Sequence, residues 1–375
     1  MSQAQSPPDA RQEGRDGVRG DRRGEKPCYA ALDLGTNNCR LLIAAPASNG
    51  FRIVEAYSRI VRLGEGMSDT GRLQEPAMGR ALAALKTCAD RIGRRKVAGL
   101  RAVATQACRS AENGAEFLAQ VEAETGLKLE VITPKQEAQL SVAGCLNLFD
   151  RDGADAALVI DVGGGSTELS WVDLTDEGLD GQAGRFEPHR LPIRAWLSMP
   201  VGVVSLAERF PEAAGDPDTW FQAMVDDVKR RVIAFPHAEK MRQVFTDGRT
   251  HMVGTSGAIT SLAGVHLGLS RYDRARVDGL WLTTDDCRTV TERLIRLTPA
   301  QRAMEPCIGP DRADLVLAGA AILRAVQDVW PCARARVADR GLREGLLLSL
   351  MAAPSKRRRR RRRRRGGTAS PQGAA

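Results

Sequence analysis

One pattern of strand, glycine-containing turn and strand occurs twice in this chain, about 128 residues apart. The first copy reads CYAALDL-GTNN-CRLLIAA from Cys28, and the second reads AALVIDV-GGGST-ELSWVDL from Ala156. An aspartate stands at the mouth of each turn, Asp33 in the first and Asp161 in the second. A repeat of this kind is a whole supersecondary unit, so the chain is predicted to form two related lobes that each open with an Asp-x-Gly hairpin.

Helices and strands alternate through the rest of both halves. The apolar spacing of Met78, Leu82, Leu85, Cys88 and Ile92 predicts a helix over 75–95. The other expected elements are strands at 51–60, 99–105, 127–133, 250–253 and 335–338, and helices at 114–125, 135–149, 203–210, 217–234, 256–266, 284–296, 312–328 and 342–352. The predicted fold class is therefore α/β, with lobes at 27–150 and 151–352, a cleft between them, and disordered tails at 1–26 and 353–375.

The charge of the chain is concentrated in one tail. The 375 residues include 43% apolar residues, enough for two cores, and carry a net charge of +9. Ten consecutive cations, Lys356 to Arg365, supply +10 and residues 1–26 supply +1, which leaves −2 for residues 27–355. A nearly neutral body gives no reason to expect a nucleic-acid-binding domain. The cationic run either tethers polyanions such as polyphosphate or nucleic acid, without sequence preference, or has no binding role.

The cysteines and the apolar runs indicate the cellular compartment in which the protein functions. None of the eight cysteines forms a CxxC pair or a Cys/His cluster, so reduced thiols are more plausible than a zinc site. No apolar run is long enough to span a membrane, and residues 1–26 lack the apolar segment of a signal peptide. We expect a cytoplasmic protein that does not enter the membrane.

The two turns have the composition of a phosphate site. Glycine lets backbone N–H groups approach anionic oxygens, and hydroxyl or amide side chains add donors. A carboxylate beside such a turn can hold Mg²⁺, which neutralises phosphate charge. The candidate phosphate-binding residues are Asp33, Gly35, Thr36 and Asn37 in the first turn and Gly163, Gly164, Gly165 and Ser166 in the second. The alternative is that these glycines only permit tight turns, and neither turn has the GxxxxGK[ST] pattern of a P-loop.

A third glycine-rich turn joins an expected strand to an expected helix. It comprises Gly254, Thr255, Ser256 and Gly257. Free N–H groups at a helix N-terminus bind anions, so these residues are further candidates for phosphate binding. Capping of the helix by Thr255 or Ser256 would explain the same residues equally well.

The three turns together resemble a known superfamily. DLGTNNCRLLI, VIDVGGGSTELS and GTSGAITSLAG, in this order and spacing, are similar to the actin-like ATPase superfamily, which has two ribonuclease H-like lobes. Within it the chain resembles the exopolyphosphatase and guanosine pentaphosphate phosphohydrolase family, over residues 28–352. Further matching stretches are ATQACRSAEN, TPKQEAQLSVAG, PVGVVSLAERF, RADLVLAGAAIL and DRGLREGLL. With four histidines and no His-Asp pair, the chain resembles the short, two-lobe form of the family.

The resemblance implies Mg²⁺-dependent hydrolysis of a terminal phosphoanhydride bond. Glu137, in KQEAQL, matches the glutamate that activates water as the general base. Asp161 and Glu168 match the catalytic acids, and these two with Asp33 are the candidate metal ligands. Arg109 matches an arginine that meets phosphate charge. Without the family, Glu137 would be an ordinary solvated helix residue and Arg109 the partner of a surface acid.

Four functions remain open at this point. The first is an exopolyphosphatase, which releases orthophosphate from inorganic polyphosphate. The second is the hydrolysis of pppGpp to ppGpp by the same acids. The others are an actin-like kinase or ATPase, which the water-activating Glu137 disfavours, and a sensor that binds polyphosphate or an alarmone without catalysis. A homodimer is expected because dimers are common in the family.

Overall fold

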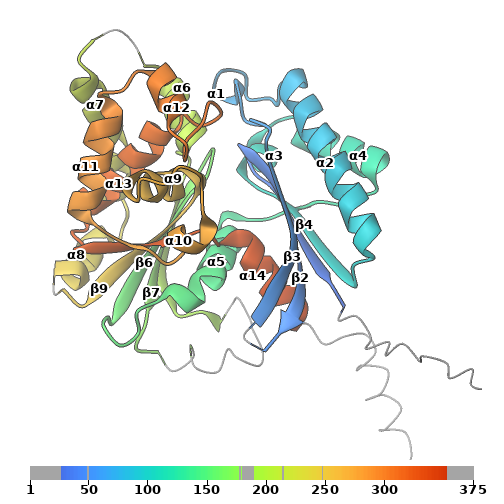
Figure 1. Ribbon diagram of the computed structural model, residues 1–375, viewed down its shortest axis with the longest axis horizontal. Coiled ribbons are helices and arrows are strands. Elements are labelled where there is room, and N and C mark those ends of the chain that lie inside the picture. The colour runs from blue at the N-terminus through green and yellow to red at the C-terminus, as the bar shows by residue number, and fades with distance from the viewer. Residues whose placement is uncertain are drawn as a thin grey trace, which may run out of the picture.

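The computed structural model describes residues 27–352, apart from residues 49, 177–178, 180–189, 213–214 and 247. The two predicted tails, 1–26 and 353–375, lie outside the described residues. Figure 1 shows two lobes side by side, joined at their base by helices α5 and α14. Within the described part of the chain, no helix is both long and apolar enough to cross a membrane.

Lobe I is built on a five-stranded sheet in the order β3-β2-β1-β4-β5. Its strands are β1 (Tyr29–Leu34), β2 (Asn38–Ala47), β3 (Gly50–Ile60), β4 (Gly99–Ala104) and β5 (Glu130–Val131). Its helices are α1 (Met67–Thr70), α2 (Glu75–Arg95), α3 (Gln106–Ser110) and α4 (Gly114–Thr125). Alternate residues of β1 and β2 and the apolar stripe of α2 give this lobe its own core, because sheet and helix bury their apolar faces against each other.

Lobe II is built on a six-stranded sheet in the order β10-β11-β9-β6-β7-β8. Its strands are β6 (Ala156–Val162), β7 (Thr167–Asp173), β8 (Ile193–Met199), β9 (Thr250–Thr255), β10 (Trp281–Thr283) and β11 (Arg334–Ala338). Its helices are α6 (Val203–Arg209), α7 (Pro217–Ile233), α8 (Ala238–Thr246), α9 (Gly257–His266), α10 (Arg274–Val277), α11 (Thr284–Ile295), α12 (Pro299–Met304) and α13 (Val316–Val329). The nearly uniform burial of α13 places it at the centre of the helical layer.

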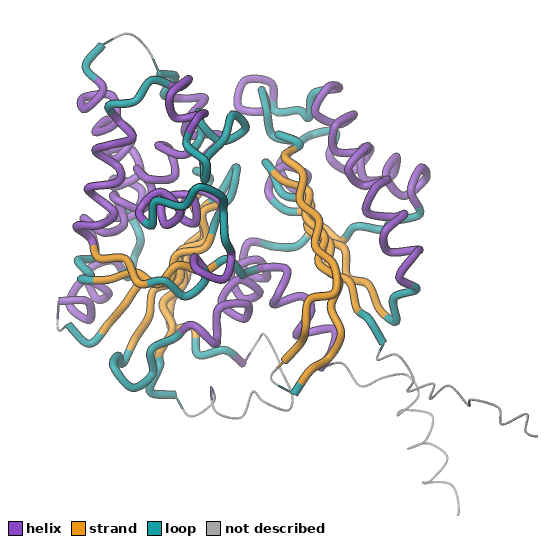
Figure 2. Tube along the Cα trace, in the orientation of Figure 1, coloured by secondary structure: helices purple, strands orange, loops and turns teal. Residues whose placement is uncertain are grey.

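The two sheets repeat one topology. Strands β3-β2-β1-β4-β5 of lobe I correspond to β8-β7-β6-β9-β11 of lobe II, with antiparallel hairpins followed by parallel strands in both. The tube in Figure 2 shows the strands of each lobe gathered in one sheet with helices outside. The predicted fold of two related α/β lobes is therefore confirmed, and the repeat in the sequence is a repeat in space.

Two helices join the lobes. They are α5 (Pro134–Cys145), followed by the 3-10 turn Leu146–Leu148, and α14 (Leu342–Ala352). Helix α14 buries Leu346 and Leu347 in a core with β1 and β2 of lobe I. Helix α5 packs its apolar face beneath the sheet of lobe II. Because the two helices also pack on each other, their crossing fixes the base of the cleft.

The sequence pattern located most elements but missed several, most of them short. Strand β8, strand β10 and helices α1, α3, α8, α10 and α12 were not expected. The strand expected at 127–133 is reduced to Glu130–Val131, an exposed edge strand with few residues to pair. The helix expected from 312 begins at Val316, because residues 310–315 form turns that precede it.

Candidate functional site

The two Asp-x-Gly turns have the same backbone geometry. In the first, the N–H of Gly35 donates to the carbonyl of Asn38 at 2.9 Å, and in the second the N–H of Gly163 donates to the carbonyl of Ser166 at 2.9 Å. A Cβ on Gly163 would lie only 2.9 Å from that carbonyl oxygen. Glycine is therefore required at position 163 by the turn itself, in agreement with the alternative interpretation, whereas the first turn leaves room for a Cβ at Gly35, 3.4 Å from the Asn38 carbonyl oxygen.

The two turns also touch each other across the cleft. A Cβ on Gly164 would lie 2.9 Å from the backbone nitrogen of Asn37. A Cβ on Gly165 would lie 2.9 Å from the hydroxyl oxygen of Thr36 and 2.0 Å from the amide oxygen of Gln106. The Thr36 hydroxyl donates to that same amide at 3.1 Å. Only glycine allows lobe II to approach lobe I this closely, so both turns face one site.

A cavity of about 500 Å³ lies between the lobes and collects most of the candidate residues. Its lining includes Asp33, Gly35, Thr36, Asn37, Glu137, Asp161, Gly163, Gly164, Gly165, Ser166, Thr255, Ser256 and Gly257. Three candidates lie outside the lining: Arg109 and Glu168 stand behind it, and Gly254 is buried in β9 against Ile259. The sequence repeat thus predicted residues that converge on one cleft from both lobes.

Glu137 reaches the cleft from the first turn of α5. Thr133 caps this helix, accepting the Gln136 N–H at 3.2 Å, and Pro134 stands at its start, where proline is favourable. The Glu137 side chain is buried, with 10% exposed, rather than solvated. Its carboxylate pairs with Arg109 at 3.2 Å, and Arg109 also donates to the carbonyl of Ile132 at 2.7 Å.

Burial controls the ionisation of Glu137. It raises the pKa of this carboxyl well above its usual value, the charge of Glu168 raises it further, and the Arg109 guanidinium lowers it. A carboxylate with a raised pKa is a stronger base than an exposed one. Arg109 therefore pairs with the candidate base and not with a surface acid, and its charge favours the ionised form of that base.

The two acids of lobe II are held by serine hydroxyls. Ser141, one turn after Glu137 on α5, donates to Asp161, and Ser198 of β8 donates to Glu168 at 2.9 Å. Burial raises the pKa of both carboxyls, to about 7 for Glu168, which the charge of Asp161 also raises. The two hydroxyls oppose these rises because they bond to the ionised forms.

Asp33 is the buried acid that lobe I contributes to the site. Burial raises its pKa to about 6, against the opposing charges of Arg40 and Arg343. Its Oδ1 atom is buried and has no hydrogen-bond partner among the described residues, and the same holds for the Oδ1 atoms of Asn37 and Asn38. Three unpartnered oxygen acceptors in one cleft suit a hard cation or a ligand that donates hydrogen bonds. The described residues contain no ready-made cluster of three metal-ligating side chains.

The hydroxyls of the third turn already form hydrogen bonds with backbone groups of the protein. Ser256 caps α9 by accepting the N–H of Ile259 at 3.1 Å, as the alternative interpretation held. The Thr255 hydroxyl donates to the carbonyl of Arg340 at 2.8 Å. What the turn still offers to the cavity is the N-terminus of a ten-residue helix, whose partial positive charge favours an anion.

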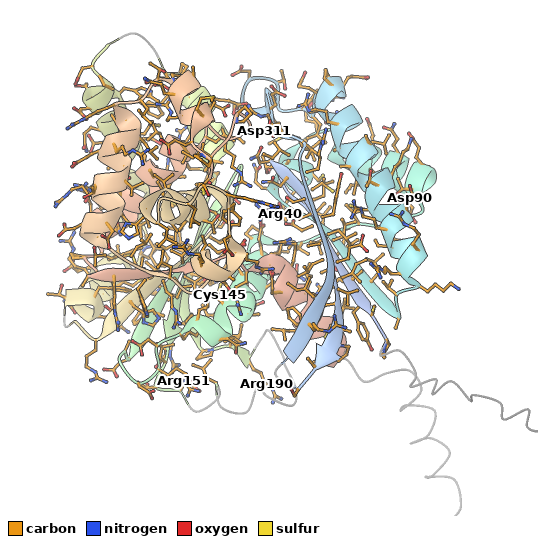
Figure 3. The ribbon with its side chains drawn as sticks, in the orientation of Figure 1. Arg40, Asp90, Cys145, Arg151, Arg190 and Asp311 are labelled. Atoms are coloured by element: carbon orange, nitrogen blue, oxygen red, sulfur yellow. The ribbon has the colours of Figure 1, made fainter. Side chains whose placement is uncertain are left out.

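Five arginines line the cavity, and the sequence analysis named none of them. Arg274 and Arg340 pair with carboxylates of Glu344 and Asp278, whereas Arg40 and Arg343 have no ion pair among the described residues. Arg40 Nη2 and the Arg312 guanidinium both lie 3.8 Å from a Cβ built on Gly257. Figure 3 places Arg40 on β2 where the lobes meet.

This arginine cluster, Arg40, Arg312 and Arg343, gives the cleft a positive wall at the helix N-terminus. Burial, and then repulsion by Arg343 and Arg312, lower the pKa of Arg40, so a bound polyanion would stabilise the cluster. Guanidinium groups match phosphate oxygens in shape as well as charge.

Comparison with known proteins places the chain among phosphatases. The model of the Ppx/GppA phosphatase family matches residues 42–353. Exopolyphosphatase 2 of Mycobacterium tuberculosis is 31% identical over 334 residues, which cover 86% of this chain and 98% of that protein. The crystal structure of the Aquifex aeolicus Ppx/GppA family member has 28% identity and a TM-score of 0.69, and the match covers 88% of this chain and 99% of that one. An exopolyphosphatase from Cytophaga hutchinsonii shares the fold at 22% identity, with a TM-score of 0.74 and coverage of 86% and 97%.

Proposed function

The chain belongs to the Ppx/GppA phosphatase family, and we propose that it is an exopolyphosphatase that hydrolyses the terminal phosphoanhydride bond of inorganic polyphosphate. The observation that carries the proposal is the position of Glu137, a buried carboxylate on the wall of the cavity that both phosphate turns line. A hydrolase needs a base beside a site for phosphate, and a kinase would need an acceptor site there instead.

In this mechanism Glu137 orients a water molecule against the terminal phosphorus and takes its proton. Water is a poor nucleophile near neutral pH, so a base with a raised pKa is needed. Arg109 holds the Glu137 carboxylate at 3.2 Å and fixes its direction. The attack breaks the bond to the next phosphate, and the proton from water remains on Glu137 until product release. The shortened chain leaves as the anionic leaving group.

The rest of the site supplies charge stabilisation. The backbone of the turns at Gly35 and Gly163, the helix α9 N-terminus and the arginine cluster all face the same cavity. Phosphoryl transfer depends mainly on such positioning and charge. Mg²⁺ would neutralise developing negative charge, and Asp33 and Asp161 would hold it, with Glu168 behind them. The unpartnered Oδ1 of Asp33 fits this role, since Mg²⁺ is often bound by one or two carboxylates and the substrate's own phosphates.

The second candidate substrate is pppGpp, cleaved to ppGpp by the same residues. The lining of the cavity also includes Tyr272, an aromatic side chain of the kind that stacks on nucleotide bases. Polyphosphate remains the first choice because the arginine cluster suits a chain of phosphates.

Parallel assays of phosphate release decide between the two substrates. We expect faster release, as kcat/KM, from long-chain polyphosphate than from pppGpp, with Mg²⁺ present and loss of activity after chelation by EDTA. A higher kcat/KM for pppGpp would assign the protein to alarmone hydrolysis. No release from either substrate would contradict the hydrolase itself.

We propose that the cationic run 356–365 concentrates polyphosphate near the cleft. Ten adjacent cations attract a polyanion without sequence preference, and the attraction falls steeply with salt. A chain ending at Ala352 should show a KM for long polyphosphate raised about three- to tenfold at low salt, and little change at high salt. Tripolyphosphate is the control substrate, because a short chain cannot span both sites. Equal KM values for the two proteins at low salt would contradict the tether.

Two further expectations are retained as proposals. All eight cysteines lie within the described residues and are thiols outside any disulfide, as is typical of a reducing compartment such as the cytoplasm. Fractionation of cells that make the protein tests this location.

The expected homodimer is tested by sedimentation velocity, where a single species with the mass of one chain would contradict it.

A further inference from the structure

The segment from Val61 to Gly71, here called the strap, runs from the end of β3 to the start of α2 and packs on the first phosphate turn. The N–H groups of Val61 and Arg62 both donate to the carbonyl of Asn37, at 2.9 and 3.0 Å. The N–H of Gly64 donates to the carbonyl of Thr36 at 2.9 Å. The strap is therefore bonded directly to the backbone of the first turn.

The strap also reaches across to lobe II at two places. Arg62 binds both carboxylate oxygens of Asp314, at 2.8 and 3.0 Å, and the carbonyl of Asp311 at 3.2 Å. Glu208 of α6 accepts the N–H of Gly66 at 3.0 Å and the hydroxyl of Ser68 at 2.7 Å. Figure 1 shows α1, which lies within the strap, between the lobes, and Figure 3 places Asp311 on the lobe II side of this contact.

The lobe II partners of the strap are themselves tied to the phosphate site. Helix α6, which carries Glu208, begins by donating its Val203 and Val204 N–H groups to the carbonyls of Gly163 and Gly164 in the second turn, at 3.0 and 2.8 Å. A Cβ on Gly202 would lie 2.4 Å from the backbone of Gly164, so helix and turn are in direct contact. The second anchor, Asp311 to Asp314, brackets Arg312 of the arginine cluster.

We propose that the strap is an interlobe clasp that sets the separation of the two phosphate turns and of Arg312. Arg62, Ser68, Glu208 and Asp314 are its positioning residues; none of them lines the cavity. When the clasp is closed, both turns line the cavity. Only in this closed state can residues of both lobes contact the same phosphate. This proposal concerns the same site as the proposed function, but the clasp can be tested without turnover.

The expected effect is on substrate binding. The contacts are half-exposed, with 31% of the Arg62 side chain and 49% of the Asp314 side chain accessible, so each contributes modestly. Opening the clasp lowers the fraction of molecules in the closed, binding-competent state. The apparent KM equals the KM of that state divided by this fraction, so it rises. The chemical step is unchanged once the substrate has closed the lobes. An increase in KM with a nearly constant kcat is therefore the signature of the clasp.

The experiment compares Arg62→Asp, Asp314→Arg and the double exchange Arg62→Asp/Asp314→Arg. Each single change places like charges together, and the double change restores an attractive pair. For the single variants we expect KM for polyphosphate to rise about fivefold with kcat within about twofold, and for the double variant to recover most of the difference. Arg72→Ala is the matched control, because Arg72 pairs with Glu112 at 3.2 Å inside lobe I.

Hydrogen–deuterium exchange of the ligand-free protein supplies a readout that needs no activity. The N–H of Gly66 donates to Glu208, so Glu208→Ala, which removes the acceptor, and the single charge variants should speed exchange in the strap several-fold. The Arg72→Ala control should not. Unchanged strap exchange in these variants would overturn the clasp, even in a protein with no phosphatase activity. Faster exchange with wild-type KM, or a KM defect that the double exchange does not repair, would also overturn it.

Discussion

Replacing Glu137 with glutamine is expected to lower kcat for phosphate release from polyphosphate by about 10²- to 10⁴-fold, the usual contribution of a general base. The amide keeps the shape of the side chain and its helical position but cannot accept a proton from water. Because Glu137 contacts water and not the phosphate chain in this mechanism, KM should stay within about threefold. Steady-state measurements of phosphate release at saturating and limiting polyphosphate separate the two constants.

Glu130→Gln is the matched control for this variant. Glu130 lies seven residues earlier, on the exposed strand β5, and its carboxylate pairs with Arg101 at 3.3 Å outside the cavity. The same chemical change there should leave kcat at the wild-type value. A Glu137→Gln enzyme that retains more than a tenth of the wild-type kcat would assign the base to another residue, and Glu168 is the next carboxylate behind the cavity wall.

The phosphate turns could be predicted because their signal is local. Asp, Gly and a polar residue within a few positions determine a hairpin turn, and the repeat of this pattern placed two such turns in one cleft. The same repeat holds a signal that the sequence analysis left unused. The backbones of Asp33 and Arg40 lie opposite each other in the register of the first hairpin, and those of Asp161 and Glu168 do so in the second, seven residues apart in each copy. Aligning the copies would have marked Arg40 as a site residue alongside Glu168.

Other parts of the site depend on contacts that no local pattern encodes. Arg312 and Arg343 reach the cavity from the loop before α13 and the start of α14, far along the chain from either turn. The sequence around either arginine does not distinguish it from an arginine on a solvent-exposed face. The strap is similar, since its role follows from carboxylates about 140 and 250 residues away. Such residues become identifiable only when the packing of the lobes is known.

The crossing of α5 and α14 yields the second large expected effect. A Cβ on Gly345 of α14 would lie 2.1 Å from the carbonyl oxygen of Leu140 on α5, and a Cβ on Gly144 of α5 would lie 2.0 Å from the carbonyl oxygen of Gly341. Both contacts are with backbone, which cannot rotate away as a side chain can. Gly345→Ala must therefore push the helices apart, and we expect it to lower the free energy of unfolding by about 2–3 kcal/mol.

Urea unfolding measures this loss, provided that the slope of free energy against urea is unchanged. Gly79→Ala is the control, because Gly79 is in the exposed face of α2 and a Cβ there meets nothing within 4 Å. That change should be neutral or stabilise the protein by up to about 1 kcal/mol, since alanine favours helix more than glycine does. Equal unfolding midpoints for Gly345→Ala and wild type would mean that the helices can separate freely. The position of Glu137, one turn before Leu140 on the same helix, would then not depend on α14, and the base would be held by Arg109 and the Thr133 cap alone.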